Sequence, residues 1–514
     1  MIKNIREKFK YILFIPLLIY LGERSLIAYD EGYYALQARW ILDKGNWIAP
    51  LWFDNIVLDR TIGVQFLIAI SQKIFGTNYF ALFLPITLAS IMMLYFTYLI
   101  HRELLGNKFA VVSPLILITT FLWINYANMA TQDIIFASAI TFGVYATIKA
   151  YKSQKGIYFL FCGSWIGLSF MFKTYLTFIP LIAISPFLIQ KKIIQNRLFW
   201  IGLILGFLPF ILWSFSILRS YGFDSYNGLF EKLITLSKNN TFTNPFYYYL
   251  WNLPLNIFPW TFFLIPGLIS SFKIKDSITK YFLFFYPLTI LLFLSLFSSK
   301  TQYYPLQILS LFSINIYLGI ISISEIKNKL NLFVRFINFK FLPLIIILSL
   351  FLINLRIIDL NLSNIQIKII SVAFLSYSIS LFSFNFLKIR KSKIISILLG
   401  PYILFIFIFH SGFITDRSRD LRLASESLIQ NESLNKRYIE TVKSDINDSV
   451  SHSKIIKILL QMPNIGNGIE SLEDLKKEEY AWSTISKDKL KIQEDIILIN
   501  NDEIFYPWKL VLKR

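Results

Sequence analysis

Long apolar runs separated by short polar stretches occupy most of the chain. Runs of roughly 15 to 20 apolar residues recur from Tyr11 to about Gly412. A bilayer core about 30 Å thick needs roughly 20 helical residues to cross it. Because the runs are continuous rather than alternating, they predict an all-α polytopic membrane protein with about 13 transmembrane helices. The expected helices are centred near Pro16, Ala89, Ile116, Phe142, Ser164, Leu181, Pro209, Leu264, Thr289, Ser313, Ile347, Leu375 and Phe405.

The basic residues between these runs predict the orientation of the chain. Lys3 and Arg6 precede the first run, and every second loop after it is basic, as at Lys388 and Arg390. Cytoplasmic loops of membrane proteins carry such an excess of Lys and Arg. We therefore expect a cytoplasmic N-terminus, a retained first helix and an extracytoplasmic C-terminus, because the number of spans is odd.

Composition supports a membrane protein and excludes other classes. Apolar residues make up 55% of the chain and charged residues 16%, against roughly 45–50% and 25% in soluble domains. The net charge of +20 does not indicate nucleic-acid binding, because the cations follow the loops. The single cysteine, Cys162, lies in an apolar run, so we expect no disulfide framework.

The first predicted outer loop, residues 29–78, has a helical pattern. Tyr33, Leu36 and Trp40 form an apolar stripe, and a second stripe ends at Phe75-Gly76, which is typical of a helix C-terminus. Each stripe is too short to span a bilayer. We therefore predict two amphipathic helices lying along the outer membrane surface.

The polar residues that stand out all fall on the predicted outer side. Asp30 and Glu31 begin the first outer loop, and Asp133 stands at the outer end of the fourth span. Lys300 and Tyr304 share a later outer turn. Simpler explanations exist: Asp133 also fits a helix N-cap, and Lys300 also fits a lysine that reaches towards the interface.

After the last apolar run the composition changes, and charges become dense and mixed. We predict a transmembrane catalytic domain over residues 1–412 and a small extracytoplasmic α/β domain over residues 413–514. Its segments Ile496–Ile499 and Trp508–Leu512 have the pattern of strands.

The outer-side residues resemble those of a known family. The chain is similar to GT-C membrane glycosyltransferases of the ArnT-like and dolichyl-phosphate-mannose protein mannosyltransferase group over roughly 400 residues. The resemblance is carried by Asp30-Glu31-Gly32-x-Tyr34, Leu58-Asp59-Arg60, Ile74-Phe75-Gly76, Asp133, Phe172-Lys173, Asn244-Pro245-Phe246-Tyr247-Tyr248, Pro259-Trp260 and Ser299-Lys300 with Tyr304.

The resemblance implies an inverting transfer of a sugar from a polyprenyl-phosphate donor to a hydroxyl or phosphate acceptor. Cations would stabilise the leaving phosphate, and a carboxylate would take the acceptor proton. The implied catalytic residues are Asp30, Glu31 and Asp133. The implied donor- and phosphate-binding residues are Asp59, Arg60, Lys300 and Tyr304, with Lys232 or Lys238 as candidates for a further phosphate contact.

The resemblance implies no metal and no cofactor. The expected partners are the lipid-linked donor and an acceptor that is a lipid A-like glycolipid, a polysaccharide or a protein. The expected location is a bacterial plasma membrane.

Three other functions remain open. A polysaccharide ligase or polymerase would carry its large outer loop late in the chain. A transporter or flippase would place ionisable residues in mid-span and show inverted repeats. A catalytically inactive scaffold is the third alternative, and the acidic and basic partners argue against it.

Overall fold

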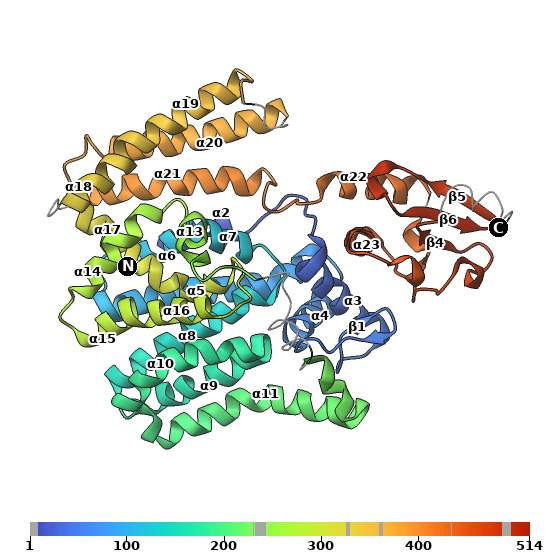
Figure 1. Cartoon of the computed structure of the whole chain (residues 1–514), viewed down its shortest axis with the longest axis horizontal. Coiled ribbons are helices and arrows are strands. Elements are labelled where there is room, and N and C mark those ends of the chain that lie inside the picture. The colour runs from blue at the N-terminus through green and yellow to red at the C-terminus, as the bar shows by residue number, and fades with distance from the viewer. Residues whose placement is uncertain are drawn as a thin grey trace.

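A bundle of helices occupies one end of the molecule, and a small sheet with its helices occupies the other (Figure 1). The computed structural model describes residues 9–229, 231, 243–324, 329–358, 363–432, 434–485 and 495–514. Helices α3 (Tyr33–Lys44) and α4 (Gly63–Phe75) lie between these two parts.

Nine helical runs within the described residues are long and apolar enough to cross a membrane, or ten if one bent pair counts as a span. The single-element runs are α5 (Tyr79–Leu105), α8 (Gln132–Ser153), α11 (Arg197–Tyr221), α20 (Asn364–Ser383) and α21 (Arg390–His410). The composite runs are α9 (Gly156–Lys173) with η3 (Thr174–Thr177) and α10 (Phe178–Gln190); α15 (Ser277–Lys280) with η7 (Tyr281–Phe285) and α16 (Tyr286–Leu296); η8 (Tyr304–Ile308) with α17 (Leu309–Ser324); and α18 (Lys329–Phe336) with η9 (Ile337–Phe341) and α19 (Leu342–Asn354). The bent pair is α13 (Tyr248–Asn256) with α14 (Thr261–Phe272), at 111°.

The predicted all-helical membrane fold is confirmed, but the count of thirteen exceeds these nine or ten runs. The apolar segment near Ile116 forms two short helices, α6 (Val112–Ile118) and α7 (Phe121–Ala127). Near Pro16 the described residues form only η1 (Phe9–Phe14) and α2 (Ile15–Leu18). Hydropathy detects an apolar run but not a break within it. These two segments, together with the run from Gly156 to Gln190 that the prediction counts as two spans, make up the difference between thirteen and ten.

The run from Gly156 to Gln190 reverses direction within itself. A Cβ added to Gly156, at its start, would lie 2.6 Å from Leu198. Leu198 follows the end of the run by only eight residues, across η4 (Ile193–Gln195). The reversal occurs at Thr174, whose φ of 25° and ψ of −102° interrupt the helix. The geometry therefore agrees with the two separate segments that the sequence predicts here, near Ser164 and Leu181.

Helices α9 and α11 pack with their backbones in contact. A Cβ added to Gly167 would lie 2.1 Å from the Phe207 nitrogen, and one added to Gly206 would lie 2.1 Å from the Ser164 oxygen. Gly163 and Gly202 make equally close approaches one turn away. This is the spacing of small residues, four apart, that lets membrane helices associate.

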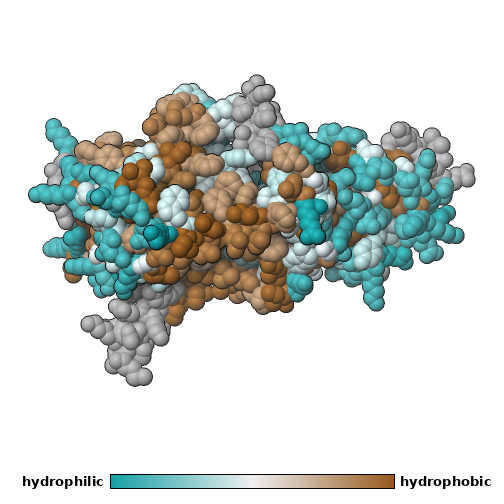
Figure 2. All heavy atoms as spheres, turned by 90° about the horizontal axis from the view of Figure 1, so that it is seen from below, coloured by the Kyte–Doolittle hydropathy of each residue, from teal (hydrophilic) through white to brown (hydrophobic). Residues whose placement is uncertain are grey.

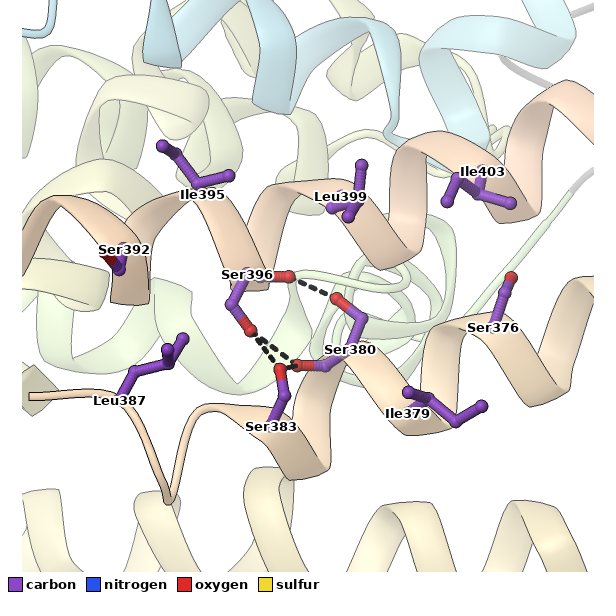
Figure 3. Close-up of a pocket in the computed structure, with 10 residues that line it drawn as sticks. All are labelled: Ser376, Ile379, Ser380, Ser383, Leu387, Ser392, Ile395, Ser396, Leu399 and Ile403. Carbon is purple, nitrogen blue, oxygen red and sulfur yellow. Dashed lines mark hydrogen bonds between the residues drawn. The ribbon is translucent and has the colours of Figure 1, made fainter.

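Serines join α20 to α21. The groove between these helices is lined by serine and aliphatic side chains, and the oxygens of Ser380, Ser383 and Ser396 lie close together (Figure 3). Ser396 Oγ donates to the Ser380 carbonyl over 2.7 Å and lies 2.6 Å from Ser383 Oγ. The hydroxyls are thereby satisfied within the helix pair, as polar groups in a membrane interior require.

An apolar belt covers one face of the bundle. Figure 2 shows hydrophobic side chains gathered over the middle of this face, with hydrophilic residues at both ends of the molecule. The belt includes Ile204, Leu212 and Phe215 on α11, which are all exposed. Such large exposed apolar surface fits contact with lipid rather than water.

Residues 29–78 form the two predicted helices, α3 and α4, and their position along the outer membrane surface stays a prediction. A short turn, η2 (Ala28–Gly32), leads directly into α3. The short strands β1 (Leu51–Trp52) and β2 (Asn55–Ile56) pair as a hairpin between α3 and α4. Both helices end at glycines with positive φ, Gly45 and Gly76, as expected for helix C-termini.

Residues after α21 form α22 (Arg419–Asn431), α23 (Ser449–Gln461) and a four-stranded sheet of order β3-β4-β6-β5. The strands are β3 (Ile439–Thr441), β4 (Tyr480–Ser483), β5 (Ile496–Asn500) and β6 (Lys509–Lys513). β3 pairs parallel with β4, and the other pairs are antiparallel. The two strands predicted from the sequence are therefore confirmed as β5 and β6. The division into domains at residues 412 and 413 stays a prediction.

Candidate functional site

Asp30 lies at the centre of the η2 turn in an unusual backbone conformation. Its φ is 54° and its ψ is −79°, a region that residues with a Cβ rarely occupy. Such a conformation costs about 1–3 kcal/mol and persists only when the surroundings impose it. The Asp30 side chain is 47% exposed, so an approaching substrate can reach its carboxylate.

Arg60 joins two carboxylates from different parts of the outer loop. Its Nη1 lies 3.2 Å from Asp30 Oδ1, and its Nη2 lies 3.1 Å from Asp59 Oδ2. The guanidinium also donates to the Tyr34 hydroxyl and lies over the Tyr34 ring, 5.0 Å from its centre. Burial opposes the positive charge, but Tyr34, Asp59 and Asp30 together raise the pKa of Arg60 well above its usual value.

Neighbouring contacts explain how the segment around Arg60 reaches this position. Thr61 Oγ1 donates to the Met171 carbonyl over 2.7 Å. A Cβ added to Gly63 would lie 2.6 Å from the same carbonyl oxygen, so only glycine allows α4 to begin this close to α9. The segment is thereby fixed against the end of α9, which carries Lys173.

A second charged pair lies between α8 and α9. Asp133, in the first turn of α8, forms an ion pair with Lys173, and both side chains are more than nine-tenths buried. The Lys173 ammonium lies 4.5 Å from the centre of the Tyr303 ring and 5.4 Å from that of Tyr304. Cations are attracted to aromatic faces at such distances. The pair is therefore enclosed by the two phenols that the sequence places on the outer side.

Tyrosines connect the two charged groups. The ring centres of Tyr126 and Tyr303 lie 5.4 Å apart, and Gln302 Nε2 donates to the Tyr126 hydroxyl over 3.3 Å. Burial raises the pKa of Tyr303 well above its usual value, and the charges of Asp133 and Asp30 add to this shift. Both carboxylates therefore lie near the same phenol. The contacts of Thr61 and Gly63 with the Met171 carbonyl, two residues before Lys173, also bring the two groups together.

Glu31 is buried and held by protein groups. Its side chain is 1% exposed, and its oxygens accept hydrogen bonds from the backbone N–H groups of Ile27 and Ala130 at 3.1 and 3.0 Å. Arg417 Nη1 lies 3.5 Å away. Burial raises the pKa of Glu31, while Arg417 and the two N–H groups oppose the shift. These contacts fit a residue that holds the turn better than one that touches substrate.

Lys300 is also held by protein groups. Its ammonium donates to the carbonyls of Asn244 and Phe297, at 2.7 and 2.5 Å, and burial lowers its pKa. These bonds fix the turn that presents Tyr303 and Tyr304 to the Asp133 pair. Lys232 and Lys238 lie outside the described residues.

The structure thus brings together Asp30, Asp59 and Arg60 in one group and Asp133 and Tyr304 in another. Glu31 and Lys300 contact backbone groups of the segments that carry these two groups. The functional roles of all seven stay predictions. Among the described residues, no group of three His, Cys, Asp or Glu side chains is arranged to hold a metal ion.

Sequence reasoning gave no role to Tyr34, Lys173 or Arg417. Tyr34 and Lys173 belong to the motifs of the resemblance, so their signal was present. Arg417 had a weaker signal: it is a cation just after the last apolar run, on the side where positive charges near membrane helices are fewer.

Comparison with known proteins shows which proteins this chain resembles in sequence and in fold. The family model described as dolichyl-phosphate-mannose-protein mannosyltransferase matches residues 59–214. An undecaprenyl phosphate-alpha-4-amino-4-deoxy-L-arabinose arabinosyl transferase from Shewanella sediminis is 26% identical over 342 residues, 63% of this chain and 62% of that protein. The enzyme of the same name from Yersinia pestis is 27% identical over 304 residues, 56% of this chain and 55% of its own length. The chain therefore matches less than two thirds of the length of these curated relatives.

Solved structures extend the likeness of the fold to the whole chain. The crystal structure of ArnT from Cupriavidus metallidurans in the apo state has a TM-score of 0.76 at 13% identity, covering 99% of this chain and 98% of that one. The structure of the same protein bound to undecaprenyl phosphate has a TM-score of 0.75 at 12% identity. Sequence and fold comparisons together confirm the resemblance predicted from the sequence, to ArnT-like membrane proteins of the GT-C glycosyltransferase group.

Proposed function

We propose that the protein is an inverting glycosyltransferase that uses a sugar linked to a polyprenyl phosphate. The acceptor is a hydroxyl or phosphate on a lipid A-like glycolipid, a polysaccharide or a protein. The observation that carries the proposal is the contact between Asp30 and Arg60. An exposed carboxylate and a cation meet there beside the buried Asp133–Lys173 pair.

The proposed reaction is a single displacement at the anomeric carbon. Asp30 takes the proton of the acceptor hydroxyl, and the acceptor oxygen forms a bond to the anomeric carbon. The bond from that carbon to the phosphate oxygen breaks, and the polyprenyl phosphate leaves with the electron pair. Among the acids, Asp30 suits the role of base because its carboxylate is 47% exposed and within reach of an acceptor.

Arg60 is proposed to bind the donor phosphate. A guanidinium offers several N–H groups in a planar fork that matches phosphate oxygens. Its contacts with Asp30 and Asp59 hold that fork in one orientation, and Tyr34 supports it from its ring face. A cation fixed in advance stabilises the charge that develops on the leaving group.

The lipid-linked donor is supported by the comparisons as well as by chemistry. Relatives named as undecaprenyl phosphate-alpha-4-amino-4-deoxy-L-arabinose arabinosyl transferases are 26% and 27% identical to this chain over 342 and 304 residues. The Cupriavidus protein of similar fold was crystallised with undecaprenyl phosphate. The sugar itself is left open, because the family model and the curated relatives carry different sugars in their names.

The apolar helices and the bacterial relatives indicate a multi-pass protein of a bacterial inner membrane. We propose that the N-terminus is cytoplasmic and that the site and the C-terminal region face outwards. The basic loops of the sequence support this orientation. The contacts of Glu31 with Ala130 and Arg417 also support it. They bring η2, the segment before α8 and the C-terminal region to the same side of the protein.

Mass spectrometry of envelope glycolipids, polysaccharides and glycoproteins tests the proposal and identifies the acceptor. Three strains are compared: the wild type, a deletion strain, and the deletion strain expressing Asp30→Asn at the wild-type level. We expect one sugar-sized mass increment to disappear from the same molecule in both altered strains. An envelope that changes in the deletion strain but is normal with Asp30→Asn would contradict the proposed role of Asp30 and favour transport instead.

A further inference from the structure

The residues after α21 contact the η2 turn on both sides of Asp30. The Tyr29 hydroxyl donates to the Ser449 carbonyl over 2.9 Å, at the start of α23. On the other side, a Cβ added to Gly32 would lie 2.8 Å from Leu460 and 2.9 Å from Ile456, both of α23. The turn is therefore closely packed against α23, and the conformation of Asp30 is set in part by this helix.

The outer loop and the C-terminal region also share one hydrophobic core. Buried residues from both parts form a continuous cluster that includes Ala28, Leu36, Trp40, Phe53, Ile455, Leu459, Trp482 and Trp508. Arg39 of α3 donates to the carbonyls of Met462 and Pro463, just beyond α23. The C-terminal region thus packs as part of the structure around the site.

Arg417 connects the segments that carry the two acidic groups. Its Nη1 lies 3.5 Å from Glu31, the residue after Asp30. Its Nη2 donates to Asn125 Oδ1 over 2.8 Å and to the Asn125 carbonyl over 3.2 Å. Asn125 belongs to α7, which leads into α8 and Asp133. One cation therefore contacts both segments that enter the site.

The chain around Arg417 is fixed independently of these contacts. Ser25 Oγ donates to Asp416 Oδ1 over 2.6 Å, and the Ser418 N–H donates to Ser25 Oγ over 2.6 Å. Asp416 also pairs with Arg422 at 3.0 Å. Arg417 is thus presented from a rigid segment, as a residue that positions another must be.

We infer that Arg417, presented by the C-terminal region, is a positioning residue that holds the Asp30 turn in its reactive conformation through Glu31. The C-terminal region is then a working part of the active site. This inference rests on the proposed function for its kinetic consequence, but its structural consequence can be measured without any activity.

The test compares Arg417→Gln with Arg419→Gln in the full-length protein in lipid nanodiscs. Arg419 is exposed and lies two residues away, so it controls for the loss of one positive charge. Hydrogen exchange of peptides covering residues 27–32 reports the turn directly, and transfer kinetics report its consequence. Arg417→Lys, which keeps the charge, covers the case in which Arg417→Gln does not fold.

We expect faster exchange over residues 27–32 in Arg417→Gln and a fall in kcat of up to about 100-fold, the loss that a misplaced group can cause. The donor KM should change little, because Arg60 keeps its contacts. Arg417→Lys should recover part of the loss, and Arg419→Gln should match the wild type. Unchanged exchange over residues 27–32 in Arg417→Gln, or in Arg417→Lys if only that variant folds, would overturn the inference. If the wild type shows no transfer activity, the proposed function is rejected. The hydrogen-exchange result then tests the positioning role of Arg417 by itself.

Discussion

At the scale of single residues, the site depends on how charges are paired. Asp30 is exposed and contacts Arg60, whereas Asp133 is buried and contacts Lys173. A carboxylate at the surface can exchange partners with a substrate, but a buried one holds its cation firmly. The two aspartates that the resemblance groups as catalytic therefore have different surroundings, which predict different mutational behaviour.

Replacing Arg60 with Ala should mainly weaken use of the lipid donor. A hydrogen bond to a charged group contributes about 1.5–3 kcal/mol, so we expect the donor KM to rise by roughly 10- to 100-fold. Arg60→Lys should lie between this variant and the wild type. Steady-state kinetics at varied donor concentration measure the effect, with exposed Arg219→Ala as the control. A donor KM that is the same in Arg60→Ala and the wild type would remove Arg60 from the donor site.

Replacing Asp133 with Asn should lower stability as well as activity. It leaves the Lys173 ammonium buried without its carboxylate, and breaking a buried pair costs about 3–5 kcal/mol. The double variant Asp133→Asn/Lys173→Met removes both charges and should recover most of the thermal stability while staying inactive. Thermal unfolding in detergent and transfer assays of both variants separate the two roles. Full activity in the stable double variant would show that this pair serves the structure alone.

At the scale of helices and strands, close packing positions the site. The α9–α11 crossing brings backbones into contact at Gly163, Gly167, Gly202 and Gly206. Because α9 ends at Lys173, this crossing also determines where the Asp133 partner lies.

Replacing Gly206 with Leu should separate the two helices and reduce the amount of folded protein in the membrane. A Leu side chain has no space, since even a Cβ would lie 2.1 Å from the Ser164 backbone oxygen. Ile204→Leu, at an exposed position of the same helix, is the matched control. Size-exclusion profiles of the detergent-solubilised variants measure the outcome. A normal profile for Gly206→Leu would mean that α9 and α11 do not pack as described.

The sequence was sufficient to predict the elements whose pattern is local. The stripes of Tyr33, Leu36 and Trp40 and of the segment ending at Phe75 predicted α3 and α4, because apolar periodicity directly reflects which face is buried. The run near Ile116 was predicted as a span but forms α6 and α7, because hydropathy does not report where a helix breaks.

The contacts that assemble the site could not be predicted from local sequence patterns. Nothing local in the sequence pairs Asp133 with Lys173, or Glu31 with Arg417 nearly four hundred residues later along the chain. The resemblance implied a catalytic role for Glu31 as well as for Asp30, and that role stays a prediction. The structure buries the Glu31 side chain and leaves that of Asp30 47% exposed. The sequence does not show such a difference between two neighbouring residues of a turn.

At the scale of the whole molecule, the apolar belt and the position of the site belong together. The belt in Figure 2 fits a bundle embedded in a bilayer, where the proposed lipid-linked donor would reside. The charged groups are carried by η2, by the segment that leads into α4, and by the start of α8 and the end of α9. A donor with its lipid in the membrane and its sugar at the surface would place the reacting carbon near Asp30.

Release of free polyprenyl phosphate by the purified protein is the most direct test of the proposed transfer reaction and of the role of Asp30 in it. Wild type and Asp30→Asn are reconstituted in liposomes with a polyprenyl-phosphate-linked sugar, and an envelope lipid extract supplies the acceptor. The lipid products are identified and quantified by mass spectrometry. Asp224→Asn, at an exposed position, is the control. We predict that wild type and control release polyprenyl phosphate and glycosylate an acceptor, and that Asp30→Asn loses at least about 100-fold in rate, as expected for a general base. Equal release by Asp30→Asn and the wild type would contradict the account.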